Sequence, residues 1–342
     1  MYATWKLSYD KLDASTRCFL QICSMLHHEG ISEEMFERAA LSEFQLEDRE
    51  LQDEVTWLLN LLGKQDSGWS SWKFHRVVKC LGSYSLIEFD QRNGTYGLHP
   101  LVQQWSATTM SENRDLMRKC VVSIIGLSIP WTIEEGDYKY RRTVLKHIIN
   151  ATTSLDLTEI DLSIATRIAR TYYDQGQWTK VEEFDVVVME KRKRLLGEDH
   201  PDTLLSMGNL GCTYRYQGRW NDAEELSVVV MEKSRRLLGE DHPRTLLSMA
   251  NLAATYRDQG RWNDAEELEV VVMEKRKQLL GEDHPDTLLS VANLAATCGN
   301  PGRSNDAEEL EMEKRKRLLG EDHPDTRLSM ANLATCRAFI SR

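Results

Sequence analysis

The sequence has 342 residues, of which 41% are hydrophobic and 28% are charged, with a net charge of −11. This composition excludes a disordered chain, and the length allows two or three domains. The excess of 54 acidic over 43 basic residues argues against binding to nucleic acid or to an anionic membrane.

Cysteine use and hydropathy indicate a protein of a reducing compartment. The seven cysteines are an odd number and include no Cys-x-x-Cys pair, so neither a disulfide framework nor a zinc site is expected. The first residues lack a basic segment followed by an apolar core, and the most apolar stretch, 120–131, is too short to span a bilayer. We therefore expect a cytoplasmic protein without a membrane segment.

The first 110 residues predict helices followed by a hairpin. Apolar residues between Phe19 and Leu26 form one helix face, and Ser32-Glu33 begins a second helix. Asn93-Gly94 is a hairpin signal. The other expected elements are helices over 54–62 and 74–81, a loop over 66–71, and strands over 85–89 and 95–98. Helices followed by such a hairpin describe a winged helix.

The charges of this segment argue against DNA binding by the winged helix. Residues 1–110 contain ten Lys or Arg and fifteen Asp or Glu. The region 43–54 is acidic where a recognition helix would need cations. No nucleic-acid partner is expected.

From residue 197 onward one sequence motif occurs four times. GEDHPDTLLSMGNL begins at Gly197, and close copies begin at Gly239, Gly281 and Gly320, at spacings of 42, 42 and 39 residues. A fixed period of this size is typical of a solenoid, in which each unit buries its apolar face against its neighbours. The short last spacing and Pro301 in its turn predict a degenerate copy.

Each period predicts two helices, called A and B. The expected boundaries are Asp202 or Thr203 as the cap of helix A, Gln217-Gly218 at its end, a capping box of Asn221 and Glu224 at the start of helix B, and Gly239 at its end. The residues expected to face inward from helix B are Ala223, Leu226, Val229, Val230 and Leu237.

This pattern resembles the tetratricopeptide repeat in the long, 42-residue form of kinesin light chains. The matching residues are Leu210, Gly211, Tyr214, Gly218, Trp220 and Ala223, repeated as Leu252, Ala253, Tyr256, Gly260, Trp262 and Ala265, with Ala169, Tyr172, Gly176 and Trp178 in an earlier unit. The small residue at 169, 211, 253 and 295 is expected to let helix B approach helix A. The expected units are 159–200, 201–242, 243–284, a degenerate 285–323 and a partial 324–342.

Differences between the first two full 42-residue units mark a candidate binding surface. Three pairs of helix A positions, spaced by four residues, form one stripe: Gly208 and Ala250, Cys212 and Ala254, Tyr216 and Asp258. The resemblance implies that this stripe faces a concave groove and varies with the partner. Drift at solvent-exposed positions is the alternative.

An asparagine recurs beside this stripe, at Asn209, Asn251, Asn293 and Asn332. In the resembled family, asparagines here hold the backbone of an extended peptide, since an amide supplies both donor and acceptor. A structural Asn bonded to the neighbouring repeat is the alternative. Arg215 and Arg257 lie close by and are candidates to pair with an acidic partner.

Two other patterns have simpler explanations. The basic segment MEKRKRLL at 189–196 has an equivalent in every helix B, so a solvated helix end is favoured over a localisation signal. The Asp-His pairs occur once per repeat and lie about a repeat apart, so loop and cap roles are favoured over metal ligation.

The N-terminal segment resembles the winged-helix part of NB-ARC-type signalling NTPases, the STAND class. WKLSYDKLD at 5–13 resembles its opening segment, and LHPLVQQW at 98–105 resembles its closing Met-His-Asp-Leu-Val motif, with Leu98 for Met and Pro100 for Asp. YRRTVLKHI at 140–148 resembles the connecting helical region of fungal NOD-like proteins, which commonly join such a module to kinesin-light-chain-type repeats.

The resemblance implies that His99 senses nucleotide by contacting the β-phosphate of ADP. The sequence contains no GxxxxGK[ST] motif, so ADP or ATP is expected only with a separate NTPase domain. A structural role for His99 at the end of the hairpin is then favoured.

Together these patterns predict a mostly α fold, with a winged-helix module over 1–110 that contains a small β-hairpin, a helical connector over 111–158, and an α-α superhelical tetratricopeptide solenoid over 159–342. We expect a non-enzymatic protein-binding module without cofactor or metal, the sensor or scaffold part of a fungal NOD-like signalling protein. The alternatives are a nucleotide-switched STAND ATPase whose P-loop domain is missing from this chain, and a kinesin-light-chain-like cargo adaptor, which needs a coiled coil that residues 110–158 do not show. The exposed end of the array is a candidate surface for self-association.

Overall fold

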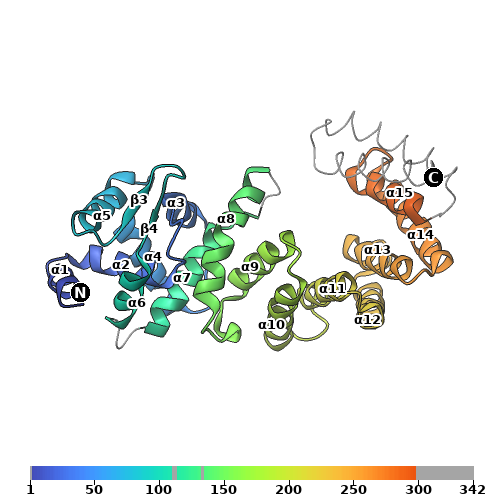
Figure 1. The fold of residues 1–342 in the computed structure, drawn as a ribbon. Coiled ribbons are helices and arrows are strands. Elements are labelled where there is room, and N and C mark those ends of the chain that lie inside the picture. Colours follow the sequence, from blue (N-terminus) through green and yellow to red (C-terminus); the bar gives the residue numbers. More distant parts are fainter. Residues whose placement is uncertain (1, 110–113, 132–134, 298–342) are drawn as a thin grey trace. The chain divides into compact units, whose positions relative to one another are not determined.

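Figure 1 shows the computed structural model, which describes residues 2–109, 114–131 and 135–297. These residues form fifteen α-helices, a single 3₁₀ turn and two short antiparallel hairpins, so the expected mostly α fold is confirmed. The chain divides into two compact units, residues 1–191 and 192–342. Most of the expected degenerate unit 285–323, and all of the partial unit 324–342 with Asn332, lie outside the described residues.

The first unit begins with helices followed by a hairpin, as expected of a winged helix. In the hairpin, Phe89 of β3 opposes Tyr96 of β4. The elements are α1 (Tyr2–Asp10), α2 (Ala14–Met25), α3 (Glu33–Leu41), α4 (Arg49–Leu62), β1 (Lys64–Gln65), β2 (Gly68–Trp69), α5 (Ser71–Ser83), β3 (Glu88–Asp90), β4 (Thr95–Gly97), α6 (Pro100–Thr108), α7 (Arg114–Ser128), α8 (Glu135–Thr152), η1 (Leu157–Glu159), α9 (Leu162–Asp174) and α10 (Trp178–Leu196).

One expectation for this unit is wrong in part. The segment 66–71, expected to be a plain loop, contributes the turn and second strand of the β1–β2 hairpin, with Lys64 opposite Trp69 and Gln65 opposite Gly68. Gly68 has a φ of 129°, which residues with a Cβ rarely adopt. The hairpin therefore depends on a glycine that the sequence pattern indicates only as part of a loop.

The core of the first unit centres on three phenylalanines from three helices. Phe19 of α2, Phe36 of α3 and Phe74 of α5 are fully buried. Their ring centroids lie 5.5, 5.4 and 5.7 Å apart, within the range in which aromatic pairs add to the free energy gained by burial. The apolar face expected between Phe19 and Leu26 is thus confirmed as a core face.

Helix α8 is fastened to the loop between α2 and α3 by the buried His147 and by Asn150. The Nδ1 atom of His147 accepts a hydrogen bond from the His27 backbone N–H at 3.2 Å, so Nε2 carries the proton and donates to the Gly30 carbonyl at 3.0 Å. One turn later, Asn150 donates to the Leu26 carbonyl at 2.9 Å. These bonds satisfy backbone groups that would otherwise be buried without partners.

The second unit is a stack of paired helices. Helix α12 contacts both α11 and α13, and α14 contacts both α13 and α15, so each helix B packs between its own helix A and the next one. The described elements are α11 (Pro201–Tyr216), α12 (Trp220–Leu238), α13 (Pro243–Asp258), α14 (Trp262–Leu280) and α15 (Pro285–Thr297).

The repeated motif places a histidine cap before each helix A. The caps are His200, His242 and His284, whose Nδ1 atoms accept hydrogen bonds from the backbone N–H two residues later at 3.1, 3.1 and 3.2 Å. The expected caps Asp202 and Thr203 are wrong, because α11 already begins at Pro201, which has no N–H to satisfy. Thr203 instead donates its hydroxyl to the Gly197 carbonyl at 2.8 Å.

A small residue in helix A sets how closely helix B approaches. A Cβ added to Gly211 would lie 3.3 Å from Ser227 Oγ and 3.7 Å from the Ala223 carbonyl of α12. Ala253, at the equivalent position of the next repeat, is fully buried. The expected close approach of the two helices is therefore confirmed.

Two details of helix B differ from expectation. Helix α12 begins at Trp220, so Asn221 lies inside the helix and is not its cap; Arg219 precedes the helix and pairs with Asp222 at 2.7 Å. The buried stripe of α12 consists of Ala223, Ser227, Val230 and Ser234. Leu237 is 43% exposed, because it lies in the last turn, beyond this stripe.

The acidic residues of the motif form ion pairs with the helix B that follows. Lys233 lies 3.2 Å from Glu198 and 2.9 Å from Asp199, and Lys275 repeats this contact with the equivalent loop. Such exposed pairs contribute little to stability, because solvent screens them. Their recurrence gives the Glu-Asp pair a structural role in the copies of the motif that begin at Gly197 and Gly239.

The expected division at residues 110 and 158 remains a prediction. Breaks between helices fall near both positions, after α6 and around η1. However, α9 contacts both α7 and α8, and the first repeat belongs to the same compact unit as the N-terminal helices.

The first unit should lose stability on acidification because of His147. Burial lowers the pKa of His147 from 6.5 to about 4, so the stability it provides is full above pH 6.5 and is lost as the pH falls toward 4. The loss from this group is about 3 kcal/mol, measurable by urea unfolding between pH 7.5 and 4.5. His147→Gln should be less stable at pH 7.5 but lose less on acidification; equal losses in both proteins would contradict the assignment.

The histidine caps should be replaceable by another acceptor. We expect His242→Ala to lower the free energy of unfolding of the repeats by about 1 kcal/mol, because the first turn of α13 loses its side-chain acceptor. His242→Asn keeps an acceptor and should lose less than half as much. Chemical denaturation of the three proteins decides the matter, and equal values for Ala and Asn would show that the cap contributes nothing.

Candidate functional site

The A helices form the inner side of the second unit. Helix α11 contacts α13 directly, and α13 contacts α15. Since helices on the inner side of a curved stack lie closest together, the exposed faces of the A helices define its concave surface. The stripe expected to line the groove is at least partly exposed throughout: Gly208, Cys212, Tyr216, Ala250, Ala254 and Asp258.

Three of the repeated asparagines have side-chain amides without a hydrogen-bonding partner in the described part of the chain. The backbone carbonyls of Asn209, Asn251 and Asn293 accept hydrogen bonds from the threonine four residues later, at 3.2, 3.1 and 3.0 Å. Their side-chain amides make no hydrogen bond to another residue in the described part of the chain, and each is at least partly exposed. A structural bond to the neighbouring repeat is therefore not seen here.

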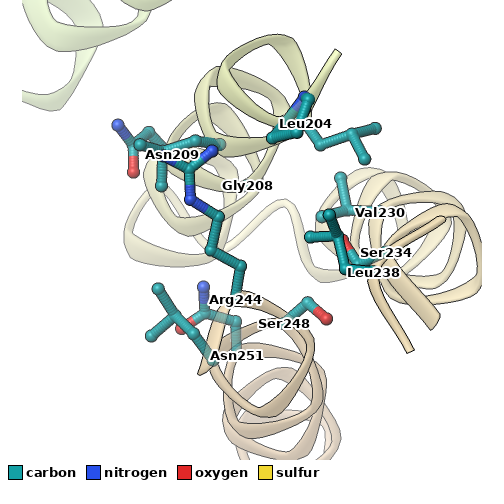
Figure 2. A pocket seen from close by; sticks show the side chains of 12 residues that line it. Leu204, Gly208, Asn209, Val230, Ser234, Leu238, Arg244, Ser248 and Asn251 are labelled. Carbon is teal, nitrogen blue, oxygen red and sulfur yellow. The ribbon is translucent and has the colours of Figure 1, made fainter. Parts of the chain in front are cut away.

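A small hollow opens between α11, α12 and α13, with two of these amides at its rim. Its volume is about 30 Å³, and its walls are mainly apolar, with Leu204 and Val230 among them. Figure 2 shows Arg244 extending from α13 toward Gly208 and Asn209 of α11, while Ser234 lies across the hollow on α12. A space of this size holds a water molecule or a similar polar group.

The two arginines expected to pair with an acidic partner are engaged within the protein. Arg215 of α11 pairs with Asp258 of α13 at 2.9 Å, so its charge links two successive repeats. Arg257 lies 3.8 Å from the carboxylate of Glu269 in α14. The residue that corresponds to Asp258 in the next repeat is Asn300, which is neutral. Glu269 is therefore the carboxylate available to Arg257.

Glu269 is the most deeply buried carboxylate of the described repeats. It is 2% exposed, and neither of its oxygens makes a hydrogen bond. Burial raises its pKa, against the smaller opposing effects of Thr297 and Arg257. The equivalent residue in the preceding repeat is the neutral Ser227, which faces Gly211.

His99 serves as a helix cap. Its Nδ1 accepts a hydrogen bond from the Leu101 backbone N–H at 3.2 Å, and Pro100 begins α6. This is the arrangement of the His-Pro caps in the repeats. The exposed His99 ring also borders a hollow of about 1140 Å³ between the β3–β4 hairpin, residues 28–30 and α8. A structural role for His99 is thus present, and its role as a nucleotide sensor remains a prediction.

Sequence reasoning missed two features of the inner surface. Leu247 and Leu289 are 41% and 43% exposed on the A helices, four residues before Asn251 and Asn293. The signal in the sequence is the second leucine of each Thr-Leu-Leu triplet, which lies outside the predicted core face of helix A. The hollow beside Ser234 was also missed. Its signal is the serine at a position where the flanking repeats have Arg192 and Arg276.

Family comparisons agree with the fold of the second half. A family model described as "Tetratricopeptide repeat" matches residues 162–202, 203–244 and 245–286. These residues therefore form tetratricopeptide repeats, with the 42-residue period seen in the sequence. A second model, described as "Domain of unknown function (DUF7779)", matches residues 7–115. Comparison with curated proteins finds no match.

Several solved structures are similar to parts of the chain. A protein of Podosopora anserina with nearly identical kinesin-light-chain TPR-like repeats is 26% identical, with 55% of this chain and 90% of that chain covered and a TM-score of 0.43. A STAND protein with a tetratricopeptide repeat sensor from Pyrococcus horikoshii is 11% identical, with 97% and 61% covered and a TM-score of 0.40. A Rap protein complexed with competence and sporulation factor is 10% identical, with 87% and 77% covered and a TM-score of 0.44.

The helices described here carry no membrane-spanning signal. Among these residues, none of the helices combines the length and the apolar character that a bilayer crossing requires.

Glu269 should weaken the repeats at neutral pH. Its pKa is raised in the folded state, so its contribution to stability is most favourable below pH 4.5 and is lost as the pH rises. Glu269→Gln should therefore unfold at a higher urea concentration than the wild type at pH 7.5, and the difference should shrink at pH 4.5. Glu269→Ser, which copies Ser227, is the matched control. A wild type more stable than Glu269→Gln at pH 7.5 would show that Arg257 compensates the buried charge.

Proposed function

We propose that the A helices of the repeats bind an extended peptide segment of a protein partner. The observation that carries this proposal is the row of amides on Asn209, Asn251 and Asn293, which recur once per helix A without a hydrogen-bonding partner among the described residues. An amide side chain can donate to a peptide carbonyl and accept from a peptide N–H, so such a row suits a backbone whose polar groups repeat regularly.

The neighbouring side chains are suited to contact the same segment. Small residues, such as Gly208 and Ala250, leave room for a peptide backbone to lie close to the helices. The exposed leucines on the same helices supply apolar contacts, which an extended segment meets with alternate side chains. Arg215 and Arg257 act here through their internal pairs, by fixing the positions of successive helices.

We further propose that this binding module is non-enzymatic and cytoplasmic, and that it is the sensor or scaffold part of a fungal NOD-like signalling protein. Support comes from the order of the motifs at 5–13, 98–105 and 140–148 before the repeats. A nucleotide-switched STAND ATPase is the alternative, with a P-loop domain outside this chain and His99 as its sensor. A kinesin-light-chain-like adaptor is less favoured, because α7 and α8 pack in the first unit's core instead of forming a coiled coil.

Replacement of two amides tests the groove. Asn209→Ala with Asn251→Ala should reduce the affinity for a partner isolated with the wild-type protein at least tenfold, because two backbone-binding groups are lost. The melting temperature should change little, since these amides bond to no described residue. Glu232→Ala with Glu274→Ala, on the B helices, is the control. Unchanged affinity of the double Asn variant would contradict the groove as the binding site.

A further inference from the structure

The hollow beside Ser234 exists because one repeat junction lacks an arginine that the flanking junctions supply. Arg192 donates to the Asp202 carbonyl at 3.1 Å and lies 3.5 Å from Ser206 Oγ. Arg276 does the same to the next helix A, 3.1 Å from the Asp286 carbonyl and 3.0 Å from Ser290 Oγ. The equivalent residue between them is Ser234. Its shorter side chain leaves open the space that an arginine fills elsewhere.

A second exchange at this junction changes the balance of charge. At the positions equivalent to Ser234 and Arg244, each flanking junction holds one arginine and one aspartate. These are Arg192 with Asp202, and Arg276 with Asp286. The middle junction holds Ser234 and Arg244 instead. Arg244 reaches back to Asp202, at 2.9 Å, which already lies beside Arg192. The pKa of Arg192 is lowered by burial, and Arg244 adds to that effect while Asp202 opposes it. The region is therefore one carboxylate short.

The groups that face the hollow have unused hydrogen-bonding capacity. Ser234 is 2% exposed, and its hydroxyl bonds to no other described residue. The Arg244 side chain is 39% exposed, and Asp202 is the acceptor that it has within the described residues, so most of its five N–H donors are free. Both residues face the same small space, with the amides of Asn209 and Asn251 at its rim (Figure 2).

We propose that this hollow receives the carboxylate of a glutamate or aspartate side chain of the bound segment, held by Arg244 and the Ser234 hydroxyl. The inference rests on the proposed function, because the acidic side chain belongs to the peptide in the groove. A guanidinium and a hydroxyl both donate to a carboxylate, and charge-assisted bonds of this kind are strong when apolar walls exclude water. The occupant thus supplies the carboxylate that the junction lacks.

A carboxylate attached to the protein tests the geometry without a ligand. Ser234→Glu places the missing group in the hollow and should melt at a higher temperature than Ser234→Gln, which has the same shape without the charge. The difference should vanish in an Arg244→Gln background. A Ser234→Glu protein that melts no higher than Ser234→Gln, with Arg244 intact, would overturn the proposal.

Binding is tested with a blocked tripeptide as probe. Acetyl-Ala-Glu-Ala-amide is titrated into the full chain, with NMR shifts of the Gly208, Ser234 and Ser248 amides as the readout, and acetyl-Ala-Gln-Ala-amide as the neutral comparison. We expect saturable shifts from the Glu peptide. The affinity derived from them should fall at least tenfold in Arg244→Gln. It should not change in Arg236→Gln, which removes an arginine outside the hollow. Equal shifts from both peptides, or shifts that Arg244→Gln leaves unchanged, would overturn the proposal.

The two proposals fail in different ways. If partner capture requires Asn209 and Asn251 but the probe does not require Arg244, the hollow is not the acidic subsite and the groove proposal stands. If partner capture survives both Asn substitutions, the groove proposal fails, and with it the assignment of the hollow to a groove-bound peptide.

Discussion

The close contact between helix A and helix B at Gly211 and its equivalents is the constraint on which the repeats depend. A Cβ added at Gly211 would lie 3.3 Å from Ser227 Oγ, and the equivalent positions hold alanine, so only a small residue fits there. That contact fixes how closely the two helices of a pair approach each other. Each helix B then fits between two A helices, and the A helices meet on the inner side. The exposed rows of asparagine and leucine on this side follow from that arrangement.

The repeated motif is constrained because nearly every residue in it has a separate structural role. In the copies that begin at Gly197 and Gly239, the glycine ends helix B with positive φ, the acidic pair binds a lysine of the following helix B, and the histidine and proline begin helix A. Positions without such a role are free to differ. Arg244 and Ser234 differ from their equivalents together, and the hollow lies where they do.

Much of the fold could be predicted from the sequence, because periodicity and glycine positions report local structure directly. The helix pairs, the hairpin at Asn93-Gly94 and the small residue at 211 are examples. The caps could not be predicted from propensity alone: aspartate and asparagine are the commoner caps, and here a histidine ring accepts the bond. Nor could the partners of Arg215 and Arg257, because their carboxylates come from helices that only the stacking brings near. Those pairs leave Arg244 as a cation with donors to spare.

Hydrogen exchange in a Gly211→Leu variant tests the central claim most directly. The added side chain would collide with the backbone of α12, so amides of α11 and α12 should lose protection together, while those of α2 and α3 should not change. Gly208→Ala is the control, because a Cβ at 208 would lie 3.9 Å from Val230, an ordinary contact. Full protection of α12 in Gly211→Leu would contradict the account, since it would mean that the paired helices stack without the close approach at residue 211.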